Sequence, residues 1–360
     1  MRTRSKHGSF AEKKRNPNSL FCPFFKLDFC LVTLYNSEAE GFASVAQRQS
    51  SGFVNRRSSV QVRPLALSLL GKAPVRKIAV VADSTCCLPP ELVQKYNIRL
   101  VPLYIVYKGK SYRDGVNITP SEVYKIMRRR KELPTTSTAS VGDFLDAYRE
   151  ASRKADSVLC ITLTGVQSKV FEAAMVAKEQ AKEVLPETTI EVLDSRAVAG
   201  ALGFVVLEAA RAADRGADLT QVGNVARTMM GKVCLLAMVD TLYFLAKTGR
   251  IARAAHWAGS LLDMKPVLEH IPAIGETMPV ARPRTRKKAV ELMLKLMAER
   301  VGNNTARVIV HHADELEDGE KLKAEIGKRF RCAELYLTEF TPAMGIHAGP
   351  GVLAISFWAD

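Results

Sequence analysis

Short, continuous apolar runs alternate with segments of helical period in the part of the chain that begins near Lys77. Runs with almost no polar residues are typical of strands buried on both faces, and such strands belong to parallel sheets that helices cover. Because helix and strand signals alternate, the pattern predicts an α/β fold with a largely parallel sheet in this first lobe. The expected strands cover residues 77–83, 99–107, 157–163 and 189–194.

Two of the intervening helices carry clear N-terminal signals. Thr119 stands three residues before Glu122, and Ser140 stands three residues before Asp143. A hydroxyl at the N-cap with an acid three residues later forms a capping box, so both pairs predict the start of a helix. Two further helices are expected over residues 168–184 and 197–215.

The pattern changes after Gly231, where strands outnumber helices. This order predicts a second α/β lobe whose strands run in mixed directions. We therefore expect residues 75–230 to form the first lobe and residues 231–360 the second. The strands are expected over 233–239, 265–271, 277–282, 307–312, 334–340 and 352–358, with helices over 287–300 and 316–330 and a short one ending at Gly249.

The net charge of +15 suggests a nucleic-acid partner, but its distribution argues against one. Residues 1–76 hold 13 of the 52 Lys and Arg residues and only 4 of the 37 Asp and Glu residues. The remaining 39 basic and 33 acidic residues give the rest of the chain a small surplus. The basic signal is local to the N-terminal segment, so no nucleic-acid partner is expected.

Residues 1–74 differ from the rest of the chain in two ways. They lack a helical or alternating period after Leu34 and show no signal-peptide arrangement. In addition, residues 45–50 can be back-translated as GUA GCU CAG CGG CAG AGC, which resembles the D-arm of a transfer RNA, and residues 59–63 can be back-translated to contain a T-arm-like sequence. We expect this extension to be either an annotation artefact, in which a neighbouring RNA gene is read as coding sequence, or a disordered basic tail.

Several kinds of chemistry are not expected from this sequence. The seven cysteines form an odd set without a CxxC pair, which favours reduced thiols in the cytoplasm and no structural zinc. His311 and His312 are adjacent in a predicted strand and point to opposite faces, so they do not form a metal site with Asp314. Common nucleotide-binding and hydrolase motifs are absent, so no cofactor is expected. No apolar run approaches the ~20 residues of a membrane-spanning segment.

The segment PTTSTAS, residues 134–140, places five hydroxyl side chains in front of a predicted helix. From the residues alone, the simpler interpretation is a turn that caps the helix through Ser140. The alternative is a binding loop whose hydroxyls face a ligand.

Motifs spread over residues 77–360 together resemble one known family. They are Asp83-Ser84-Thr85, Asp114-Gly115, Thr136-Ser137 with Ser140, Asp194-Ser195-Arg196, Gly249-Arg250-Ile251, Lys265-Pro266, Arg284 with Lys287, and His347-Ala348-Gly349-Pro350-Gly351. In this order and spacing they resemble the DegV family, the fatty-acid-binding subunits of the bacterial fatty acid kinase system.

The resemblance implies a DegV domain over residues 75–360 that holds one long-chain fatty acid between two lobes and is not itself an enzyme. An ATP-dependent partner kinase would phosphorylate the carboxyl group of the bound acid. The acyl phosphate would then pass to phospholipid synthesis.

The resemblance also implies a set of head-group residues. Thr136 and Ser137 would hold the carboxylate from one loop, and either Thr164 or Ser168 would hold it from the next. This chain has Ser168-Lys169-Val170 where the family tends to have Ser-Gly-Thr, and Thr138-Ala139 in place of Gln-Pro, so the second hydroxyl ligand stays open. Arg250 and His347 are expected near the head group or on the surface that faces the kinase.

An autonomous α/β enzyme acting on a small acyl or phosphorylated substrate is the competing hypothesis. An enzyme of that kind needs a general base within reach of its nucleophile. Residues 134–140 contain no His, Asp or Glu, and His347 is the candidate from elsewhere in the sequence.

Overall fold

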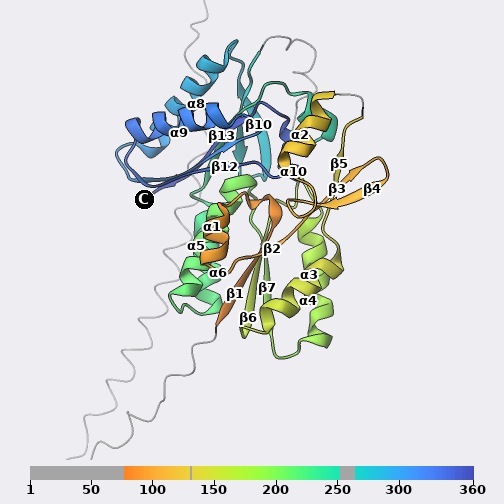
Figure 1. The fold of residues 1–360 in the computed structure, drawn as a ribbon. Helices are drawn as coiled ribbons and strands as arrows, with labels where there is room; N and C mark the ends of the chain where they lie inside the picture. The colour runs from red at the N-terminus through yellow and green to blue at the C-terminus, as the bar shows by residue number, and fades with distance from the viewer. Residues whose placement is uncertain (1–76, 130–131, 252–263) are drawn as a thin grey trace, which may run out of the picture. The chain divides into compact units, whose positions relative to one another are not determined.

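The first sheet is built from the buried apolar runs that the sequence predicts. The computed structural model describes residues 77–129, 132–251 and 264–360, so the expected extension over residues 1–74 lies outside the described residues. The sheet has the strand order β2-β1-β6-β7, and all its neighbouring strands are parallel (Figure 1). The strands are β1 (Ile78–Asp83), β2 (Arg99–Val101), β6 (Ser157–Thr162) and β7 (Thr189–Asp194).

Helices cover both faces of this parallel sheet, as its apolar strands require. Helices α3 (Val141–Ser152) and α4 (Val170–Val184) pack together on one face, and α5 (Ala199–Asp214) and α6 (Leu219–Met230) pack on the other (Figure 1). Ser140 accepts a hydrogen bond from the Asp143 N–H, and the Asp143 carboxylate accepts one from the Ser140 N–H. The predicted capping box of α3 is therefore confirmed. Helix α6 and the short α1 (Pro90–Lys95) were not predicted from the sequence.

The expected strand over residues 99–107 is wrong as a single element. The chain leaves the first sheet after Val101, and β3 (Tyr104–Tyr107) joins a separate antiparallel sheet of order β4-β3-β5. Pro102 has no N–H to continue a ladder, and the Leu103 N–H is bound by the Ser84 hydroxyl at 3.1 Å. The small sheet is completed by β4 (Lys110–Arg113) and β5 (Thr135–Ser137), with α2 (Pro120–Arg129) between them in sequence.

The second lobe contains the mixed sheet that the sequence predicts. Its strand order is β10-β9-β8-β13-β11-β12; only β11 and β12 run parallel, and the other neighbours are antiparallel. Helices α8 (Arg286–Val301) and α9 (Leu316–Arg329) pack on one face of it (Figure 1). The strands are β8 (Cys234–Met238), β9 (Val267–Ile271), β10 (Glu276–Ala281), β11 (Ala306–His312), β12 (Cys332–Glu339) and β13 (Leu353–Ala359); the short helices are α7 (Tyr243–Thr248) and α10 (Pro342–Ala348).

Helix α5 lies between the two sheets. It contacts β1 and β6 of the parallel sheet and β8 and β13 of the mixed sheet. One continuous cluster of buried apolar side chains runs from the first sheet across α5 to Ile309 and Ala354 in the second. The close approach depends on glycine, because a Cβ at Gly200 would lie 2.4 Å from His311 Nε2 and one at Gly203 would lie 2.5 Å from the Cys86 carbonyl oxygen.

Among the described residues, no helix combines the length and apolar character that a membrane crossing requires. No group of three or more His, Cys, Asp and Glu side chains within this part of the chain is arranged to hold a metal ion. The cysteines that the structure describes are all free thiols.

Replacing Gly200 with alanine should destabilise the fold by about 1–3 kcal/mol, because the added methyl group meets a side chain that cannot move freely. His311 is fixed by the hydroxyls of Thr338 at 2.8 Å and Ser356 at 3.0 Å. Urea unfolding of the purified protein would measure the change. As a control, Gly142→Ala places a Cβ no closer than 3.6 Å to the Ser140 oxygen, so it should be neutral or stabilising by up to about 1 kcal/mol. Equal unfolding midpoints for the two variants would contradict the packing role of Gly200.

Candidate functional site

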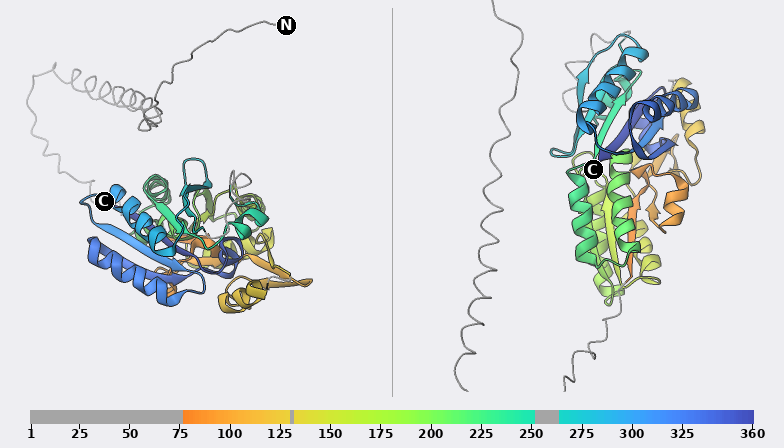
Figure 2. Two further views of the ribbon diagram at one scale, coloured as in Figure 1. Left: turned by 90° about the horizontal axis from the view of Figure 1, so that it is seen from above. Right: turned by 90° about the vertical axis from the view of Figure 1, so that its left-hand side faces the viewer.

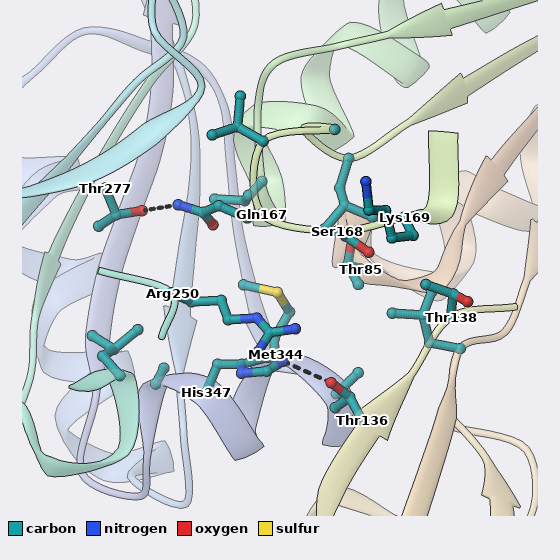
Figure 3. A pocket seen from close by; sticks show the side chains of 18 of the residues that line it. Thr85, Thr136, Thr138, Gln167, Ser168, Lys169, Arg250, Thr277, Met344 and His347 are labelled. Atoms are coloured by element: carbon teal, nitrogen blue, oxygen red, sulfur yellow. Dashed lines mark hydrogen bonds between the residues drawn. The ribbon is translucent and has the colours of Figure 1, made fainter. Parts of the chain in front are cut away.

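A cavity of about 350 Å³ lies where the loops at the carboxyl ends of β1 and β6 meet α7, α10 and β10. Binding sites in α/β folds are typically formed outside the carboxyl ends of parallel strands. Much of the wall surface is apolar, although many polar side chains also lie on it (Figure 3). The apolar lining includes Leu103, Leu163, Val198, Leu245, Ala343 and Met344; the polar lining includes Thr85, Thr136, Ser137, Thr138, Gln167, Ser168, Lys169, Arg250, Thr277 and His347.

Thr136 reaches the cavity from a strand rather than from a turn. It belongs to β5 and lies opposite Ile105 of β3, so the two side chains share one face of the small sheet. Ile105 is completely buried, which shows that this face is the inner one. Ser137 and Thr138 also line the cavity, whereas Ser140 is used to cap α3. Within residues 134–140 the expected capping by Ser140 is therefore confirmed, and the binding role of the residues that line the cavity stays a prediction.

The Thr136 hydroxyl lies 2.9 Å from His347 Nε2 (Figure 3). These residues are 211 positions apart and come from different lobes. Burial, and to a smaller extent the nearby Arg250 guanidinium, lowers the pKa of His347 to about 4. The imidazole is therefore neutral near pH 7, when one ring nitrogen carries a proton and the other accepts.

Arg250 brings a positive charge to the same wall of the cavity as His347 (Figure 3). It follows Gly249, which ends α7 in the left-handed conformation at φ 71°. Its guanidinium donates a hydrogen bond to the Thr248 carbonyl oxygen, so the side chain is held by the end of its own helix. Arg250 therefore lines the cavity from the end of α7, and its expected place near the head group or the kinase stays a prediction.

The loop after β6 separates the two candidates for the second hydroxyl ligand. Ser168 lines the cavity, but Thr164 does not. Thr164 is fully buried; its hydroxyl donates to the Gly275 carbonyl oxygen at 3.1 Å and accepts from the Val166 N–H. Thr164 thus joins the loop to the β9–β10 turn, and Ser168 is the one of the two hydroxyl residues that lines the cavity.

Buried carboxylates fix the loops beneath the cavity. Asp83 at the end of β1 accepts hydrogen bonds from the Leu163 N–H and from both the N–H and the hydroxyl of Thr85. Asp114 accepts from the Ser84 hydroxyl and from the Ala343 N–H at the start of α10. Burial raises the pKa of Asp83 to about 6 and raises that of Asp114 as well, although these donors oppose the shift.

The glycines after α10 position His347. Helix α10 runs up to Ala348, so His347 lies on the helix and the glycines follow it. A Cβ at Gly349 would lie 2.3 Å from the Phe244 ring, and one at Gly351 would lie 2.5 Å from the Asp240 carboxylate. Both glycines also have positive φ, so other residues would strain the turn. The helix could have been recognised from Thr341-Pro342, since proline is favoured at the first helical position.

A short chain of hydrogen bonds joins the lobes beside the cavity. Gln167 donates to the Thr277 hydroxyl at 3.4 Å, and that hydroxyl lies 3.1 Å from His270 Nδ1. The other ring nitrogen of His270 lies 2.9 Å from the Arg196 carbonyl oxygen. No local pattern predicts these partners, because they are distant in the chain and are brought together by the β9–β10 hairpin.

Comparison with known proteins identifies the family. The family model of the uncharacterised DegV proteins matches residues 77–360, so the chain belongs to the DegV family. Protein DegV of Bacillus subtilis is 30% identical over 280 residues, which cover 77% of this chain and 98% of that protein. The predicted family and fold class are both confirmed.

Two similar solved structures are those of fatty-acid-binding proteins. One is a fatty-acid-binding DegV family protein of Thermus thermophilus, with 32% identity and a TM-score of 0.72 over 79% of this chain and all of that one. The other is a stearic-acid-binding protein of Eubacterium ventriosum, with 26% identity and a TM-score of 0.72 over 78% of this chain and 98% of that one.

His347 should make the stability of the ligand-free protein depend on pH. Its pKa is about 4 in the folded state and near 6.5 when unfolded, so the unfolded chain binds more protons between these values. The free energy of unfolding therefore falls as the pH falls from 6.5 towards 4. His347→Gln should reduce this fall by about 2 kcal/mol between pH 6.5 and 4.5, measured by urea unfolding. Because the other titrating groups are common to both proteins, parallel pH profiles would show that His347 is not held neutral by burial.

Proposed function

We propose that the DegV domain, residues 75–360, binds one long-chain fatty acid in the cavity between its lobes, residues 75–230 and 231–360. The observation that carries this proposal is the composition of the cavity wall. Apolar side chains from both lobes form much of it, and hydroxyls at Thr136, Ser137 and Ser168 are gathered on the same cavity. A fatty acid needs both surfaces, since its tail is rejected by water and its carboxylate by an apolar interior.

The tail supplies the driving force for binding. At ~0.8 kcal/mol for each buried CH₂ group, a sixteen-carbon chain gains on the order of 11 kcal/mol before association costs are deducted. An unpaired carboxylate in the cavity would cancel much of that gain. Each hydroxyl that donates to the carboxylate contributes roughly 1.5–3 kcal/mol, so two or three donors are sufficient to restore it.

Thr136 can donate to the carboxylate only if its own hydrogen is not used by His347. With the proton on Nε2, the neutral imidazole donates to the Thr136 oxygen, 2.9 Å away, and the hydroxyl hydrogen is free to point at a ligand. His347 then acts as a positioning residue for Thr136. Arg250 adds a positive charge nearby that favours an anionic head group.

The bound carboxyl group is presented to a separate ATP-dependent fatty acid kinase in the cytoplasm, which forms an acyl phosphate for phospholipid synthesis. Neutral donors suit this task because they hold the carboxylate without neutralising the attacking oxygen. The Thr136–His347 pair also has the separation of a nucleophile and its base, which is the feature of an autonomous enzyme. Against that alternative, His347 Nδ1 has no hydrogen-bond partner among the described residues, so no third group orients the imidazole as a base.

The proposed function predicts that the protein retains lipid when it is purified from bacteria. Native mass spectrometry of the full chain should show a mass excess equal to one long-chain fatty acid, and denaturation should release that acid for identification. A protein that carries no lipid and hydrolyses small acyl or phosphate esters instead would support the enzyme.

The head-group assignment predicts the behaviour of a double variant. Thr136→Ala with Ser168→Ala removes two proposed donors, so palmitate affinity should fall by about a hundredfold or more, while affinity for its uncharged methyl ester should change little. Ligand titration of the delipidated protein measures both values. Ser152→Ala is a suitable control, because the Ser152 hydroxyl bonds the Arg149 carbonyl oxygen on α3 and does not line the cavity. Unchanged palmitate binding by the double variant would show that these hydroxyls are misassigned.

A further inference from the structure

Lys169 is a charged residue of the cavity to which the proposed function gives no task. It follows Ser168 directly and lies beside it on the first-lobe wall, across the cavity from Arg250 (Figure 3). Its position immediately before α4 also places it where the helix dipole favours an anion. A lysine next to a proposed carboxylate-binding hydroxyl changes the charge that an incoming head group meets.

The ammonium group of Lys169 is paired only weakly. It lies 2.6 Å from Glu172 Oε1, three residues later on α4, and the side chains are 74% and 60% exposed. Exposed pairs at this spacing contribute little, because water screens them and both side chains lose rotamer freedom. Lys169 can therefore exchange Glu172 for another anion at small cost, using the freedom of its four-carbon stem.

We propose that Lys169 is a specificity-determining residue that pairs with the anionic end of the bound lipid and favours a phosphorylated acyl chain over the free acid. The inference rests on the proposed function, since it assumes that the head group lies near Ser168. The attraction of one cation grows with the charge of its partner, and a phosphate monoester carries more negative charge at neutral pH than a carboxylate does. Arg250 keeps its charge but has less freedom to follow the ligand, because its guanidinium is held by a hydrogen bond to the Thr248 carbonyl oxygen.

Glu172 sets the strength of this preference by competing for the same ammonium group. Removing the Glu172 charge should release Lys169 for the ligand, whereas removing the Lys169 charge should abolish the preference. A purely structural role for the pair would make both changes act in the same direction. The opposite signs therefore separate ligand recognition from helix stabilisation.

The test uses the full chain, stripped of lipid, with three sixteen-carbon probes of different charge: hexadecanol, palmitate and hexadecyl phosphate. Lys169→Gln should leave hexadecanol affinity unchanged, weaken palmitate about threefold and weaken hexadecyl phosphate about tenfold. Glu172→Gln should tighten hexadecyl phosphate about threefold. Both phosphate effects should shrink at high salt, because the pair lies at an exposed position.

A matched control is available on the same helix. Lys182 pairs with Glu179 at the same spacing and with similar exposure, but it does not line the cavity. Lys182→Gln should leave all three affinities unchanged.

If the wild-type protein binds palmitate and Lys169→Gln keeps the wild-type ratio of phosphate to palmitate affinity, the role of Lys169 is overturned and the proposed function stands. If Lys169→Gln weakens all three probes equally, the effect is structural and the inference also fails. If the wild-type protein binds none of the probes, both proposals fail.

Discussion

The close packing of α5 between two sheets is the constraint on which the rest of the structure depends. A helix that is buried against a sheet on each side cannot carry side chains of ordinary size at its closest contacts, and Gly200 and Gly203 occupy those contacts. The first faces His311 in the second lobe, and the other faces the Cys86 carbonyl oxygen in the first. Because the same helix fixes the distance of both sheets from its axis, it also fixes how far apart the cavity walls lie.

Polar groups around the cavity are held by partners that are distant in sequence. Asp114, for example, joins the Ser84 hydroxyl to the Ala343 N–H, so one carboxylate links the end of β1 to the start of α10. Burial of Asp114 is costly to its charged form, and the donors offset that cost. These hydrogen bonds hold α10 and the loop after β1 in fixed positions, as a preorganised head-group site requires.

The cavity combines neutral and charged groups in a way that suits a bound anion. Thr136 and Ser168 offer hydroxyls, His347 is kept neutral by burial, and Arg250 and Lys169 contribute positive charge from opposite walls. A carboxylate held mainly by hydroxyls remains able to attack, whereas surrounding cations help to attract it and to bind a more highly charged product. The proposed roles of these hydroxyls and cations depend on a head group that lies near Ser168.

The sequence by itself determined the order of most strands and helices, the capping of α3 and the membership of the family. Those features depend on residues close together in the chain, such as apolar runs of strand length and the Ser140–Asp143 pair. It did not reveal that Pro102 divides one apolar run between two sheets, nor that α10 precedes the glycines after His347. Only the tertiary structure decided that Thr136 meets His347, that Ser168 rather than Thr164 faces the cavity, and that Gln167 reaches Thr277. These arrangements rest on contacts between residues more than 100 positions apart. Local propensity carries no information about such partners, because only the folding of the whole chain brings them together.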